Sequence, residues 1–120
     1  MSADQNPAVD QETIESLREL MEDEFDDLVN EFLEDTTKLL ANLQQAVQTG
    51  DPVALRRDAH ALKSSSANMG AMTLSGFARD MERLGGEGVT EPAVSLVEQA
   101  TTEFVTVRSE LEALMEQTSA

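Results

Sequence analysis

The most specific pattern in the chain is Ala59-His60-Ala61-Leu62-Lys63-Ser64-Ser65-Ser66-Ala67-Asn68-Met69-Gly70. It contains the only histidine among 120 residues, with Lys63 three positions after it and Ser64 four positions after it. Residues three and four apart are neighbours on one face of an α-helix. We therefore predict a helix that presents His60 and Lys63 together on one side.

A second stripe of the same helix is small and mostly apolar, which is typical of a buried face. It consists of Leu55, Ala59, Leu62, Ser66 and Met69. This helix is then expected to have its back in a hydrophobic core while the His60 and Lys63 side chains face water.

The longest regular pattern precedes this helix. Apolar residues recur three, four and seven positions apart from Phe25 to Val47, which predicts a long amphipathic helix. Gly50 is expected to end it, because glycine readily adopts the left-handed conformation that closes helices. Asp51 and Pro52 then start the central helix as N-cap and first helical residue.

Three further patterns complete the chain. They predict a short helix from Asp10 or Gln11 to Met21, a helix that Thr73 caps, and a last helix that begins near Thr90. Gly85-Gly86-Glu87-Gly88 is the clearest predicted loop.

Together these patterns predict an all-α protein, an antiparallel four-helix bundle with a short N-terminal helix. We expect residues 1–10 to form a flexible tail, residues 11–117 to form the bundle, and residues 118–120 to fray.

The composition excludes several classes of function. The net charge is −16, from 8 basic and 24 acidic residues, which argues against binding to nucleic acid or to anionic lipid. Such a charge favours solubility, or alternatively steers the protein towards a partner with a basic surface. Cysteine is absent, no apolar run approaches the roughly 20 residues that a membrane span needs, and no secretory signal pattern is visible. We therefore predict a cytoplasmic protein without a membrane span.

His60 can serve several chemistries, and the neighbouring residues decide among them. A metal site needs several ligands, and the chain has no second histidine and no cysteine. A hydrolytic triad is disfavoured, since Asp58 is two residues away and points elsewhere on a helix. Capture of a phosphoryl group on the imidazole fits better, because Lys63 can balance its charge. From spacing alone, His60 and Lys63 can equally be ordinary structural or surface residues.

The segment from His60 to Gly70 resembles the signature of histidine phosphotransfer (HPt) domains. That signature reads H-x-L-K-G-S/A-S/A, followed after a few residues by an apolar residue and Gly. The matching positions are His60, Leu62, Lys63, Ser65, Ser66, Met69 and Gly70. Ser64 departs from it, since the family usually has Gly directly after the Lys to keep the surface beside the His bare.

The resemblance implies a phosphocarrier without kinase activity of its own. His60 would accept a phosphoryl group from the Asp of one receiver domain and pass it to the Asp of another. Lys63 would stabilise the phosphorylated imidazole, and the required Mg²⁺ would lie in the receiver, so this chain itself would need no cofactor. The implied partners are response-regulator receivers and a hybrid sensor histidine kinase, and we expect a monomer.

Other residues are expected to support the site or the docking of a partner. The supporting candidates are Ser64, Ala67, Gly70, Arg79, Glu82 and Arg83. An apolar docking patch is sought at Ala61, Ala67 and either Met21 or Phe25, although Phe25 is also typical of a plain core residue. The alternative function is a non-catalytic helical adaptor that binds and regulates a receiver or a sensor kinase.

Overall fold

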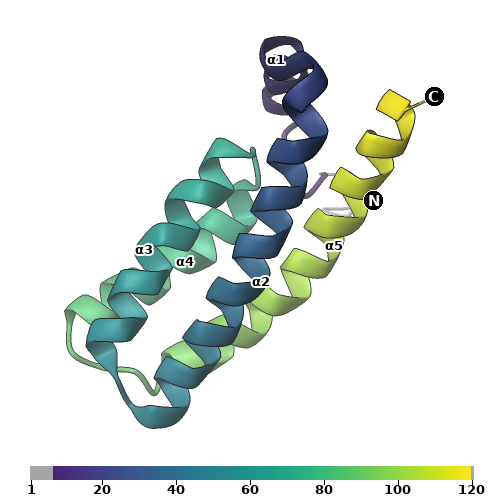
Figure 1. The fold of residues 1–120 in the computed structure, drawn as a ribbon. Coiled ribbons are helices and arrows are strands. Elements are labelled where there is room, and N and C mark those ends of the chain that lie inside the picture. Colours follow the sequence, from purple (N-terminus) through teal and green to yellow (C-terminus); the bar gives the residue numbers. More distant parts are fainter. Residues whose placement is uncertain (1–6, 120) are drawn as a thin grey trace, which may run out of the picture.

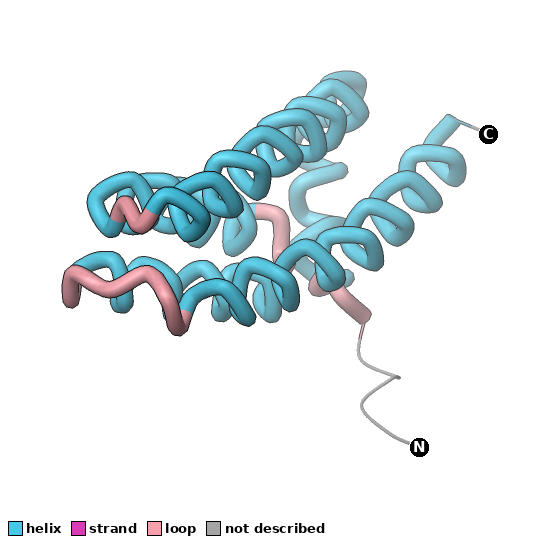
Figure 2. The backbone as a smooth tube through the Cα atoms, turned by 90° about the horizontal axis from the view of Figure 1, so that it is seen from below, coloured by secondary structure: helices cyan, strands magenta, loops and turns pink. Residues whose placement is uncertain are grey.

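The computed structural model describes residues 7–119, with side chains as far as Met115. This part of the chain contains five α-helices, one 3-10 helix and no strand, with short connections (Figure 2). The elements are α1 (Gln11–Met21), the 3-10 helix η2 (Glu22–Glu24), α2 (Phe25–Thr49), α3 (Pro52–Asn68), α4 (Met72–Gly86) and α5 (Ala93–Ser119).

The four long helices form an antiparallel bundle, which confirms the predicted fold. α2 packs on α3, α3 on α4, α4 on α5, and α5 returns to α2, so that each helix contacts both of its neighbours. In Figure 1, α3 and α4 run as a close pair on one side, with α2 and α5 beside them. The short α1 packs at the end of α2 from which the chain enters the bundle.

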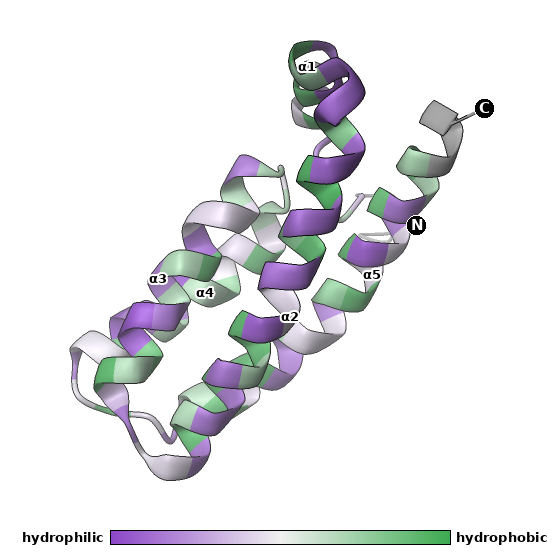
Figure 3. Cartoon of the chain, in the orientation of Figure 1, coloured by the Kyte–Doolittle hydropathy of each residue, from purple (hydrophilic) through white to green (hydrophobic). Residues whose placement is uncertain are grey.

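The core lies along the bundle axis and is filled by the apolar stripes. Phe32 and Phe104 meet edge to face, with ring centroids 6.5 Å apart. Hydrophilic and hydrophobic residues alternate along each helix, as expected of amphipathic helices (Figure 3). Across residues 7–119, no helix combines the length and the apolar character needed to cross a membrane.

The ends of α1, α2 and α3 follow the predicted signals. The Asp10 carboxylate caps α1 by accepting the Thr13 N–H at 3.0 Å, and Asp51 caps α3 by accepting the Ala54 N–H at 3.1 Å. Gly50 ends α2 in the left-handed conformation with φ of 66°. A side chain at that backbone angle would be strained, which explains why glycine terminates the helix there.

The boundaries of α4 differ from the prediction. The residue before the helix is Ala71 instead of Thr73, and it makes no side-chain cap. Gly85 and Gly86 also belong to α4 instead of the predicted loop, which begins only after them. Gly85 is buried against α3, so packing decides its conformation in place of its weak intrinsic preference for helix.

The segment before α1 is partly built into the bundle. Residues 1–6 of the expected tail lie outside the described residues, but Ala8 and Val9 are buried. Their backbone N–H groups donate to the two carboxylate oxygens of Glu110 on α5, at 2.9 and 3.1 Å. The fixed structure therefore begins before residue 11, because a carboxylate on the last helix holds the incoming backbone.

At the other end of the chain, α5 extends as a helix through Ser119. The expected fraying of residues 118–120 stays a prediction. Residue 120 lies outside the described part of the chain.

Candidate functional site

His60 lies at the middle of α3, on the surface of the bundle. Its side chain is 62% exposed. The predicted inner stripe of the same helix, Leu55, Ala59, Leu62, Ser66 and Met69, is buried throughout. The burial of one face therefore holds α3 in a fixed rotation that directs His60 outward.

The turn from α3 to α4 is held by backbone contacts around Gly70. Gly70 has a φ of 77°, and a Cβ there would come within 3.1 Å of the Asp10 nitrogen. The Gly70 carbonyl accepts a hydrogen bond from that same N–H at 2.8 Å. The glycine thus serves both the sharp turn and the docking of the segment before α1.

Beyond the turn, α3 and α4 approach each other closely. The Ser75 hydroxyl donates to the Lys63 carbonyl at 2.9 Å, which ties the start of α4 to the functional stretch of α3. Near the other end of the pair, a Cβ on Gly85 would lie 2.7 Å from the Arg56 nitrogen and 2.8 Å from the Pro52 oxygen. These two contacts fix which residues of α4 stand opposite His60.

Glu82 of α4 joins His60 and Lys63. One carboxylate oxygen, Oε2, lies 2.8 Å from His60 Nδ1, and the other, Oε1, lies 2.7 Å from Lys63 Nζ. The Glu82 side chain is 21% exposed and that of Lys63 is 34% exposed. The carboxylate therefore bridges two side chains that stand one helical turn apart on α3.

The charge on Glu82 is stabilised by this arrangement. The hydrogen bond from the Lys63 ammonium, and after it that from the His60 ring, lower the pKa of Glu82 below its ordinary value, against a smaller opposing effect of burial. Glu82 is accordingly ionised throughout the neutral range and can act only as a hydrogen-bond acceptor.

An ionised carboxylate at Nδ1 fixes the tautomer of a neutral His60 ring. Because Glu82 can only accept, Nδ1 must carry the proton that it donates. The other ring nitrogen, Nε2, then holds the free lone pair on a largely exposed side chain. The arrangement orients a nucleophilic nitrogen towards solvent while the proton on the opposite nitrogen stays paired.

Among the other supporting residues predicted from the sequence, the α3 candidates flank His60. Ser64 and Ala67 follow at helical spacing on the same side, Ser64 exposed and Ala67 half-buried. The α4 arginines are exposed and engaged elsewhere: Arg79 is 3.6 Å from Asp80 and Arg83 is 3.6 Å from Glu87. Of the three α4 candidates, only Glu82 contacts the imidazole.

The predicted docking patch is only partly present. Ala61 is exposed, but Phe25 is fully buried and is a core residue. Met21 is partly buried and packs against the core. Neither residue supplies an open apolar surface.

Sequence reasoning missed a depression beside His60. It has a volume of about 440 Å³ and is lined by Val53, Arg56, Arg57, His60 and Glu82. The signal was available, since Val53, Arg56 and Arg57 precede His60 by seven, four and three residues. That spacing places all of them on the same helical face.

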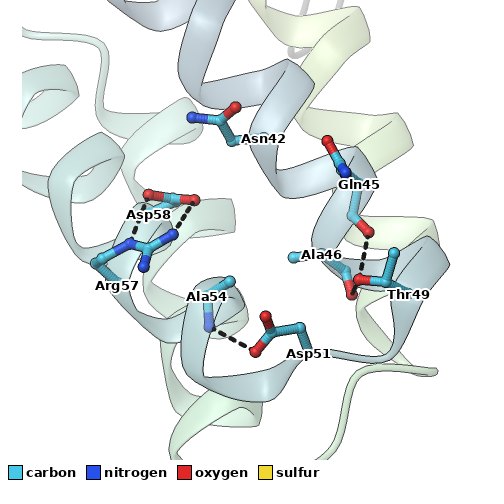
Figure 4. A pocket seen from close by; sticks show the side chains of 8 residues that line it. All are labelled: Asn42, Gln45, Ala46, Thr49, Asp51, Ala54, Arg57 and Asp58. Carbon is cyan, nitrogen blue, oxygen red and sulfur yellow. Dashed lines mark hydrogen bonds and ion pairs between the residues drawn. The ribbon is translucent and has the colours of Figure 1, made fainter.

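A second, polar groove lies between α2 and α3 (Figure 4). In it, Arg57 donates to both carboxylate oxygens of the mostly buried Asp58, at 3.2 and 3.4 Å. The charge of Asp58 is therefore already paired within the protein. Its remaining lining includes Asn42, Gln45 and Asp51. His60 does not line this groove, so we assign the site to the outer face of α3 and α4.

The described residues contain no group of three or more histidine, cysteine, aspartate or glutamate side chains that could hold a metal ion.

Comparison with known proteins identifies the family. The Hpt domain family model matches residues 27–120, a range that contains the whole of α3 and α4. The chain belongs to the Hpt domain family. No curated protein matches it.

A solved structure of an Hpt protein supports the same assignment. The chain is similar to the histidine-containing phosphotransfer protein B (HptB) from Pseudomonas aeruginosa PAO1, at 37% identity and a TM-score of 0.89. The alignment covers 97% of this chain and 98% of that protein. The likeness to this Hpt structure therefore extends over nearly the whole bundle, including α1, which precedes the family match.

Proposed function

We propose that this protein is a phosphorelay intermediate that carries a phosphoryl group on Nε2 of His60. It would accept the group from the aspartyl phosphate of one receiver domain and pass it to the aspartate of another. The observation that carries the proposal is the pairing of Nδ1 with Glu82, which leaves Nε2 free and exposed in a member of the Hpt domain family.

The transfer step balances without an additional base. The Nε2 lone pair attacks phosphorus, the N–P bond forms, and the bond from phosphorus to the aspartyl oxygen breaks to release the carboxylate. The ring keeps its Nδ1 proton and gains positive charge, which the ionised Glu82 is placed to balance. The reverse sequence returns the phosphoryl group to a second aspartate.

Lys63 is proposed to stabilise the phosphoryl oxygens. Its ammonium group is now held by Glu82, one helical turn from His60. A phosphoryl group on Nε2 would offer it anionic oxygens as further acceptors for its three N–H donors. Lys63 would then be shared between Glu82 and the phosphoryl group.

The remaining roles belong to partners. We place the Mg²⁺ of the reaction in the receiver domain and the phosphorylation of the first receiver in a hybrid sensor histidine kinase. This chain would have no kinase activity of its own and would act in the cytoplasm. We propose a monomer, since one outward His60 face needs no second copy.

Transfer from phosphorylated receiver domains tests the proposal. A small panel of receivers, phosphorylated with acetyl phosphate and Mg²⁺, is incubated with the wild type, His60→Gln and the control variant Ser64→Ala. We expect an acid-labile, alkali-stable label on the wild type and on Ser64→Ala, and no label on His60→Gln. Receivers that bind the wild type and His60→Gln equally well without labelling either would favour the adaptor function instead.

A further inference from the structure

The charge of this protein is unevenly distributed along the chain. Residues 52–86, which form α3, α4 and the turn between them, contain five of the eight basic residues and only three of the 24 acidic ones. This helical pair therefore has a net charge of +2, whereas the rest of the chain has a net charge of −18. The helical pair that carries His60 and Glu82 is therefore weakly basic in a protein whose total charge is strongly negative.

The basic side chains gather around His60. Arg56 and Arg57 line the depression next to it, and Lys63 stands one turn further along α3. Arg79 and Arg83 lie three residues before and one residue after Glu82, exposed on α4. The five cations thus lie on the two helices that carry His60 and Glu82.

Several of these cations are available to a partner. Arg56 is exposed and forms no ion pair within residues 7–115. The pairs of Arg79 and Arg83 are exposed and 3.6 Å long, so they hold those guanidinium groups only weakly. Binding an external carboxylate would therefore cost little internal stabilisation.

The depression also offers an apolar contact. Val53 is 74% exposed and lines its wall two helical turns from His60. Such an exposed valine beside guanidinium groups suits a partner surface on which an apolar side chain is bordered by carboxylates.

We propose that the outer face of α3 and α4 is a cationic docking surface for a receiver domain with an acidic face, and that charge orients the encounter. Arg56 attracts the carboxylates of that face next to His60, while the carboxylate-rich remainder of this protein repels it. The inference deepens the proposed function and rests on it. It differs from the alternative interpretation of the net charge, which was steering towards a partner with a basic surface.

Matched variants of equal net charge test the docking surface. Arg56→Gln is compared with Lys38→Gln, since Lys38 is exposed in a groove between α2 and α5 and both changes remove one positive charge. The rate constant of phosphotransfer from a receiver that labels the wild type is measured at low receiver concentration over a range of NaCl concentrations. We expect the wild-type rate to fall as salt rises.

In low salt, we expect Arg56→Gln to slow transfer about three- to tenfold, with a weaker dependence on salt, and Lys38→Gln to stay within about twofold of the wild type. Arg56→Glu should slow transfer further, and Lys38→Glu should not. The docking proposal would be contradicted if changes at positions 56 and 38 had equal effects, or if the transfer rate rose with salt. Neither result would contradict the proposed phosphocarrier function. If no receiver labels the wild type, the proposed function fails and this inference fails with it.

Discussion

His60 Nδ1 lies 2.8 Å from Glu82 Oε2, so the ring nitrogen that faces the bundle is paired and the opposite one is free. Histidine and glutamate come from different helices and are 22 residues apart in sequence. Their contact turns an ordinary surface histidine into an oriented nucleophile, and several measurable consequences depend on it.

The first prediction concerns the tautomer of His60. In the wild type at a pH where the ring is neutral, ¹⁵N NMR should detect the proton on Nδ1. Glu82→Ala removes the acceptor, so the proton should redistribute towards Nε2 and phosphotransfer should slow about tenfold. Glu82→Gln keeps a carbonyl acceptor and should lie between the two. An unchanged tautomer in Glu82→Ala would show that Glu82 does not position the ring.

The second prediction concerns the pKa of Glu82. Lys63 is the largest cause of its lowered pKa, so Lys63→Met should move the carboxyl midpoint in a ¹³C NMR titration upward towards the ordinary value of 4.5. Glu103 provides a control of opposite sign, because burial and the nearby Glu110 raise its pKa above 4.5. Its midpoint should not respond to Lys63→Met.

The same pair has a predictable effect on stability. A carboxylate whose pKa is lower in the folded state stabilises the fold above the unfolded-state pKa and loses that contribution as pH falls through the folded-state pKa. The free energy of unfolding of the wild type should exceed that of Lys63→Met by less than about 1 kcal/mol at pH 7. The difference should vanish on acidification below the folded-state pKa of Glu82. A difference that persisted there would point to packing of the Lys63 stem instead.

The third prediction concerns the close approach of α3 and α4 at Gly85. A methyl group there would meet the backbone of Arg56 and Pro52 at under 3.0 Å, so Gly85→Ala should force the helices apart. We expect a loss of about 1–3 kcal/mol in the free energy of unfolding, measured by urea denaturation. Gly76→Ala is the control, since nothing lies within 4 Å of its added Cβ and alanine favours helix. It should be neutral or stabilising by roughly 0.5–1 kcal/mol.

The fourth prediction concerns the apolar contact at the docking surface. Val53→Ser should raise the KM for phosphotransfer from a receiver about threefold or more, because the change removes an apolar contact next to His60. Val105→Ser is matched to it, since Val105 is 65% exposed on α5, away from the site. Both variants should unfold at the same urea concentration as the wild type. Equal KM values for Val53→Ser and Val105→Ser would show that Val53 does not contact the receiver.

The sequence was sufficient for the bundle and for the outward direction of His60, because strong apolar periodicity sets both. It was not sufficient to choose Glu82 over Arg79 and Arg83, which are equally polar residues of α4. Which of the three faces His60 depends on the position of α4 along α3. The contacts of Gly70, Ser75 and Gly85 set that position. These contacts join residues on different helices, so they cannot be predicted from the residue types within α4 alone.

Two other differences have similar causes. Gly85 and Gly86 were assigned to a loop by composition, but close packing on α3 keeps them helical. Ala8 and Val9 lack helical periodicity, and their burial depends on Glu110, about 100 residues later in the chain. A periodic pattern that spans a few helical turns cannot predict contacts between residues so far apart in sequence.

The position of the phosphoryl group on the labelled protein shows which atom acts as the nucleophile. The protein is labelled with ¹⁵N in histidine, phosphorylated by a receiver domain, and observed by ¹H, ¹⁵N and ³¹P NMR. We predict a single phosphohistidine at residue 60, with phosphorus bonded to Nε2 and the proton retained on Nδ1. Phosphorus on Nδ1, or an acid-stable phosphate on Ser64, Ser65 or Ser66, would contradict it.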